Sequence, residues 1–66
     1  MKYFEVYEHI EGLPYYLDTE IKELTECLIE FCNTEKQVEK EIEKINKENS
    51  TDKHGRKRIL YANWYD

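Results

Sequence analysis

The chain has 66 residues, of which 39% are hydrophobic and 38% charged, and its formal net charge at pH 7 is −5. A chain of this length forms one domain with a small core, so we expect a single domain over residues 1–66. Its nine aromatic residues argue against wholesale disorder, and its acidic balance disfavours nucleic acid unless the cations gather on one side.

Membrane insertion and disulfide formation are both unexpected. No apolar run approaches the ~18 residues of a membrane-spanning helix, and the first residues, MKYFEVYEHI, lack the apolar stretch of a signal peptide. We therefore expect a cytoplasmic protein. Cys27 and Cys32 would point to different sides of a helix, so we interpret them as small buried hydrophobic residues.

Residues 2–18 have the pattern of a β-hairpin. Phe4, Val6 and Ile10 alternate with polar and tyrosine residues, which is typical of a strand. Glu11-Gly12 supplies a turn signal, and residues 13–17 resume an extended apolar and aromatic run. Pro14 has no N–H to donate and belongs near the start or on an edge of this second strand.

A first helix is predicted from Asp18-Thr19 to about Cys32. Short oxygen-bearing side chains accept from first-turn amides, and the acidic residues that follow suit the positive end of the helix dipole. The apolar positions form one stripe, made of Ile21, Leu24, Cys27, Leu28 and Phe31. The opposite face carries Lys22, Glu23, Glu26 and Glu30.

A second helix is predicted over residues 34–49. Asn33 is able to take the left-handed conformation that ends helices, and Thr34 with Gln37 has the spacing of a capping box. The narrow apolar stripe consists of Val38, Ile42 and Ile45. The outer face carries Lys36, Lys40, Glu43 and Lys47.

One continuous helix over residues 20–49 is the alternative. The apolar positions keep an unbroken heptad spacing from Ile21 to Ile45, with Glu35 as the only polar member. Such a helix would project and dimerise through its second half. We favour two helices because Asn33 and Thr34 are weak helix formers and the capping signals coincide there.

A last strand completes the expected fold. A polar, turn-rich segment leads into residues 58–65, RILYANWY, where Leu60, Ala62 and Trp64 alternate with Ile59, Tyr61, Asn63 and Tyr65. The order β-β-α-α-β predicts an α+β fold with a three-stranded antiparallel sheet and two helices on one face. We interpret the tyrosines and the tryptophan of the sheet as core side chains.

No pattern predicts an enzyme or a cofactor. His9 and His54 fall in a strand and a loop with no nucleophile marked nearby. The cysteines lack CxxC spacing and the histidines do not form an HxxxH pair, so no metal site is expected. The two glycines, Gly12 and Gly55, do not make a phosphate-binding loop.

The hairpin followed by TEIKELTECLIEFCNTEKQVEKEIEKI resembles small proteins of bacteriophages and mobile elements that carry a β-hairpin and a helix-turn-helix-like pair. The vocabulary rich in Lys, Glu, Ile and Asn also resembles that of AT-rich Gram-positive bacteria and their phages. The resemblance implies a short acidic accessory protein that binds and inhibits a host protein, such as a defence enzyme or a nucleic-acid-handling enzyme.

Three functional hypotheses follow from these patterns. The favoured one is a non-enzymatic protein-binding module that docks by charge and aromatic anchoring. Its expected contact residues are Glu23, Glu26, Ile29, Glu30, Tyr7 and Tyr15. The alternative is a nucleic-acid-binding regulator that uses Lys36, Lys40, Lys47, Lys53, Arg56, Lys57 and Arg58. A homodimer zipped through Val38, Ile42 and Ile45 is the third.

Overall fold

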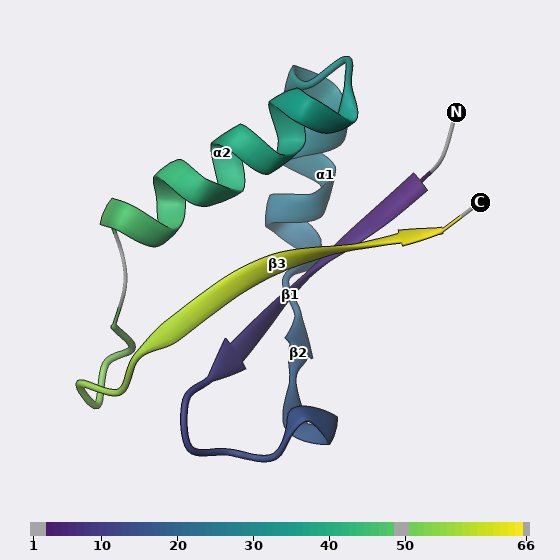
Figure 1. Cartoon of the computed structure of the whole chain (residues 1–66). Helices are drawn as coiled ribbons and strands as arrows, with labels where there is room; N and C mark the ends of the chain where they lie inside the picture. The colour runs from purple at the N-terminus through teal and green to yellow at the C-terminus, as the bar shows by residue number, and fades with distance from the viewer. Residues whose placement is uncertain (1–2, 49–50, 66) are drawn as a thin grey trace.

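The computed structural model describes residues 3–48 and 51–65, and Figure 1 shows how the elements are arranged. In chain order they are β1 (Tyr3–Ile10), a 3-10 helix η1 (Tyr15–Leu17), β2 (Thr19–Glu20), α1 (Lys22–Phe31), α2 (Glu35–Glu48) and β3 (Arg58–Tyr65). The sheet is antiparallel with the order β2-β1-β3. The predicted α+β fold is confirmed.

The β1–β3 ladder makes up most of the sheet, because all eight residues of each strand are paired. Tyr3 lies opposite Tyr65 and Ile10 opposite Arg58. Successive side chains of a strand point to opposite faces. The even-numbered residues of both strands therefore share one face and the odd-numbered residues share the other.

The core fills the space between the even-numbered face and the two helices. α1 packs on β1 and α2 packs on β3. The buried hydrophobic residues are Phe4, Val6, Leu28, Cys32, Val38, Ile42 and Leu60. Val6 has no exposed surface, and Trp64 packs partly buried against this cluster. The two α-helices thus cover one face of the sheet and leave the other without an α-helix.

The prediction of a second hairpin strand over residues 13–17 is wrong. Residues 13–17 do not form a strand, and β2 comprises only Thr19 and Glu20. Local bonds replace the expected ladder: the Leu17 N–H donates to the Pro14 carbonyl (3.1 Å) and the Asp18 N–H to the Tyr15 carbonyl (3.0 Å). Proline at the start of this segment favours such a turn, because its φ of −62° is already fixed.

The first helix begins later than predicted, because the chain first forms the local turn and β2. Asp18 and Thr19 precede or belong to β2, and Ile21 is the N-cap, without a capping side chain. The buried stripe of α1 also differs from the prediction: Thr25 and Cys32 are buried, whereas Cys27 and Phe31 are exposed. Thr25 is inside because its hydroxyl accepts from the Val6 N–H (2.9 Å) and donates to the Ile21 carbonyl (3.0 Å).

The two-helix prediction is confirmed, and the single helix over 20–49 is wrong. The backbone becomes extended at Cys32 (φ −111°, ψ 137°). The Gln37 N–H donates to Thr34 Oγ1 (3.2 Å), and Gln37 Oε1 accepts from the Asn33 N–H (2.6 Å). In the described residues only glycines have positive φ, so the left-handed conformation expected of Asn33 is also wrong. Residue 49, the predicted end of the second helix, lies outside the described residues.

One side chain joins α2 to the outer edge of β3. Asn46 Oδ1 accepts from the Leu60 N–H (2.8 Å), and Asn46 Nδ2 donates to the Leu60 carbonyl (3.0 Å). The amide thereby replaces a neighbouring strand at this position. An edge strand otherwise presents backbone groups to other chains, so the bond also protects part of the edge.

Candidate protein-binding surfaces

The outer side of α1 carries three exposed glutamates, which we call the acidic helix face: Glu23, Glu26 and Glu30. At 100° per residue these positions lie opposite the buried Leu28. None of the three forms an ion pair with another described residue of this chain. Ile29, which is 54% exposed, lies beside Glu26 and Glu30 on the same side of the helix. These four residues lie together, as the sequence predicts.

Tyr7 and Tyr15 do not join the acidic helix face. Tyr7 is an odd-numbered residue of β1, so it lies on the sheet face that points away from the helices, and it stacks on Tyr61. Tyr15 belongs to η1 and stacks on His9. The expected contact residues are thus divided between two opposite sides of the molecule.

The helix-free side of the sheet carries a set of residues that we call the tyrosine face: Tyr3, Glu5, Tyr7, Tyr61, Asn63 and Tyr65. Tyr3 and Tyr65 stack with ring centroids 4.8 Å apart, and Tyr7 and Tyr61 stack at 5.9 Å. The interpretation of the tyrosines as core residues is therefore wrong. In the described chain no tyrosine is part of the buried core.

Glu5 lies in the centre of the tyrosine face, between the two stacked pairs. The Tyr7 hydroxyl donates to Glu5 Oε1 at 3.4 Å. A hydrogen bond to Glu5, with burial next in importance, raises the pKa of Tyr65 to about 12. Asn63 Nδ2 donates to the Tyr65 hydroxyl at 3.0 Å. The Tyr65 phenol therefore stays protonated at neutral pH, and Glu5 supplies an acceptor among the tyrosines.

A polar cluster closes one end of the tyrosine face. His9 Nδ1 lies 2.7 Å from Asp18 Oδ1, and the Tyr61 hydroxyl donates to Asp18 Oδ2 at 2.5 Å. The Tyr15 ring covers the His9 ring at a centroid distance of 4.2 Å. The Tyr61 bond, with the His9 contact after it, lowers the pKa of Asp18 although burial acts in the opposite direction. Sequence analysis missed this cluster because Asp18 and Tyr61 are 43 positions apart.

The polar cluster and the buried thiol lie on opposite sides of the sheet. The buried thiol, Cys32, belongs to the core on the other side of the sheet. Burial, followed by the Glu41 carboxylate, raises the pKa of Cys32, which keeps the thiol protonated and weakly nucleophilic. Within residues 3–48 and 51–65 no group of three or more His, Cys, Asp or Glu side chains could hold a metal ion.

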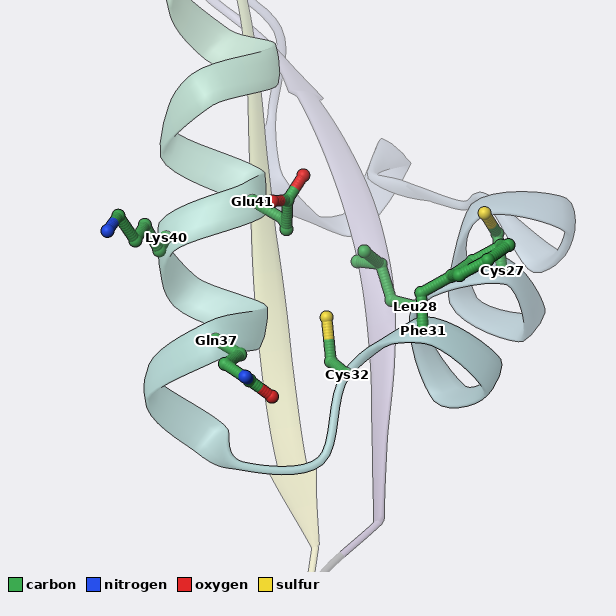
Figure 2. Close-up of a pocket in the computed structure, with 7 residues that line it drawn as sticks. All are labelled: Cys27, Leu28, Phe31, Cys32, Gln37, Lys40 and Glu41. Carbon is green, nitrogen blue, oxygen red and sulfur yellow. The ribbon is translucent and has the colours of Figure 1, made fainter.

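A pocket opens between the two helices on the side of Phe31 (Figure 2). Cys27, Leu28 and Phe31 of α1, together with Cys32, face Gln37, Lys40 and Glu41 of α2. Figure 2 shows Glu41 pointing into the gap and Lys40 extending away from it. Phe31, which is 75% exposed, thus lines the same pocket as the free thiols of Cys27 and Cys32 and the Glu41 carboxylate.

The cations of the nucleic-acid alternative lie on α2 and in the turn before β3. Lys36, Lys40 and Lys47 are exposed along the outer side of α2. Among the described residues, carboxylates engage three of the seven cations: Lys47 with Glu43 (3.7 Å), Arg56 with Asp52 (3.4 Å) and Arg58 with Glu8. Lys53 and Lys57 are exposed in the turn. The positive charge is therefore partly neutralised within the fold.

In comparisons with family models, curated proteins and solved structures, nothing matches this chain. Among the described residues no helix is long and apolar enough to cross a membrane.

Proposed function

We propose that this chain is a non-enzymatic protein-binding module whose contact with a basic partner surface is the tyrosine face. The observation that carries the proposal is the arrangement of four tyrosines in two stacked pairs on the sheet face opposite the two α-helices, where Tyr3 is 57% exposed. Tyrosine is among the residues that contribute most binding energy in protein interfaces, because it buries a large area and keeps a hydrogen-bonding hydroxyl.

Charge favours a basic partner. Glu5 lies on the tyrosine face, Asp18 lies at its end, and Glu20 is the cross-strand neighbour of Tyr7. In the rows from Tyr3–Tyr65 to His9–Ile59, the register of the described strands brings no lysine or arginine to this face. A phosphate backbone would be repelled here, whereas lysine and arginine side chains would be attracted.

The acidic helix face has a different part in the proposal. Its glutamates lie on the far side of the helical layer, so they do not touch a partner that docks on the tyrosine face. They add to the net charge of −5 and so raise the rate of encounter with a basic protein. The resemblance to phage accessory proteins extends the proposal to a host protein as the target and to inhibition as the outcome.

Capture of a partner from a nuclease-treated lysate of an AT-rich Gram-positive bacterium tests the proposal. Tyr3→Ala should abolish or strongly weaken capture, because it removes an exposed ring from the tyrosine face. Tyr16→Ala is the matched control, since Tyr16 is 84% exposed on η1. It should retain the partner.

Two results would contradict the proposal. One is recovery of bound material only when nuclease is omitted, which would indicate the nucleic-acid alternative and its lysines. The other is equal loss of capture in Tyr3→Ala and Tyr16→Ala. A third variant, Glu23→Gln with Glu26→Gln and Glu30→Gln, should slow association but keep the captured protein.

A further inference from the structure

We infer that the tyrosine face recognises arginine side chains presented by an extended segment of the partner. This inference rests on the proposed function and names the chemistry of the same surface. It is carried by the ring geometry of the two tyrosine pairs together with the position of Glu5 between them.

The rings of each pair lie nearly parallel. The interplanar angle is 20° for Tyr3–Tyr65 and 21° for Tyr7–Tyr61. Nearly parallel rings at centroid distances of 4.8 and 5.9 Å overlap in a stack, unlike the mutually inclined rings that enclose a trimethylammonium group. The outer ring face of such a stack fits a planar cation, and the guanidinium of arginine is planar and stacks on aromatic rings.

Glu5 supplies the counter-charge at the right place. It is two residues from Tyr3 and two from Tyr7 on the same strand, so it lies between the two stacked pairs. A guanidinium pairs with a carboxylate through two parallel hydrogen bonds, which a lysine ammonium cannot reproduce. The Tyr7 bond to Glu5 Oε1 is long, at 3.4 Å, so a stronger donor can replace it.

The spacing suits an extended partner. Tyr3 and Tyr7 are four strand positions apart, which corresponds to about 13 Å at the usual rise per residue. Arginines at alternate positions of an extended segment all point to one side and recur about every 7 Å. Such a segment places guanidinium groups over both tyrosine pairs and over Glu5 in turn.

A second copy of this chain is a poor occupant. Two tyrosine faces brought together about a twofold axis through their centre would oppose Glu5 with Glu5. Like charges directly opposed in an interface are unfavourable. Charge complementarity therefore selects a cationic partner segment.

The test is a titration with two capped nine-residue peptides, one alternating arginine with threonine and the other alternating lysine with threonine. Binding is followed by NMR at the tyrosine rings and at the side-chain amide of Asn63. The arginine peptide should bind at least about five-fold more tightly than the lysine peptide, because only guanidinium adds stacking and bidentate pairing. Glu5→Gln should remove most of this preference.

Glu26→Gln is the matched control, since it changes the net charge equally on the opposite side of the molecule. It should keep the arginine preference. Fluorescence of Trp64, the one tryptophan, verifies that each variant is folded. Equal affinity for the two peptides, or resonance changes confined to α1, would overturn the arginine inference alone. The proposed function would fail separately, if Tyr3→Ala still captured the partner.

Discussion

Substitution of Thr25 tests how the backbone of β1 is satisfied beyond the two-residue strand β2. Its hydroxyl satisfies the N–H of Val6, a residue with no exposed surface. Thr25→Val keeps the shape but leaves this buried N–H without a partner, which costs about 1–3 kcal/mol of unfolding free energy. Urea unfolding followed by Trp64 fluorescence measures the loss. Thr19→Val, at an exposed position of β2, should change stability by less than about 0.5 kcal/mol.

The bond between Tyr61 and Asp18 predicts a pH dependence. The pKa of Asp18 is lowered in the folded chain, so its contribution to stability is present above the unfolded pKa of about 3.9 and is lost as pH falls through the folded value. Tyr61→Phe removes the largest cause of that shift. The pKa of Asp18, followed by NMR titration of its carboxyl carbon, should therefore rise.

The bond between Tyr61 and Asp18 also predicts a loss of stability at alkaline pH. The pKa of Tyr61 is raised to about 12, chiefly by its bond to Asp18, so its contribution is complete below pH 10 and is lost as pH rises through about 12. Tyr61→Phe should thus destabilise the chain most near neutral pH and progressively less toward both extremes. Tyr16→Phe should have no such profile. An unchanged Asp18 pKa in Tyr61→Phe would contradict the assigned bond.

At the scale of elements, the break between the helices depends on a cap. Thr34 Oγ1 accepts from the Gln37 N–H, and Gln37 Oε1 accepts from the Asn33 N–H. Thr34→Ala removes the first of these bonds and should cost about 1 kcal/mol in urea unfolding. Thr34→Ser keeps an oxygen in place and should retain most of the stability. Equal losses in both variants would mean that the methyl group, not the cap, matters.

The hydrogen bonds of Asn46 between α2 and β3 are expected to affect both stability and solubility. Asn46→Ala leaves the N–H and the carbonyl of the buried Leu60 without partners and opens the edge of β3. We expect a loss of about 1–3 kcal/mol and more self-association at high concentration. Urea unfolding and light scattering measure the two effects. Lys47→Ala, at the next and exposed position, should show neither.

The elements were largely predictable, and each wrong prediction has a local cause. Periodicity located β1, α2 and β3, because each has a single buried side over eight or more residues. β2 was not predictable, since two residues carry no period and Pro14 begins a local turn instead. Phe31 was assigned to the buried stripe of α1 and Thr25 was left out of it, because polarity alone does not reveal a hydroxyl required by a neighbouring strand.

At the scale of the molecule, composition predicted the charge but not where the tyrosines lie. Their alternation along β1 and β3 could be read from the sequence, and so could their common face. What the sequence could not tell was that both helices cover the even-numbered face. Interpreting the tyrosines as core residues assumes that aromatic side chains lie on the same face as the aliphatic ones. Here aliphatic residues and Phe4 fill the small core, and the tyrosines remain on the helix-free face.

The way the core is filled also bears on oligomeric state. A dimer zipped through Val38 and Ile42 would have to withdraw both side chains from the chain's own core, where they are 2% and 3% exposed. A net charge of −5 opposes close approach of two copies as well. We therefore expect a monomer of 8.1 kDa in sedimentation equilibrium at physiological salt. A mass that doubles with concentration would contradict this, and persistence of that dimer in Tyr3→Ala would place the contact away from the tyrosine face.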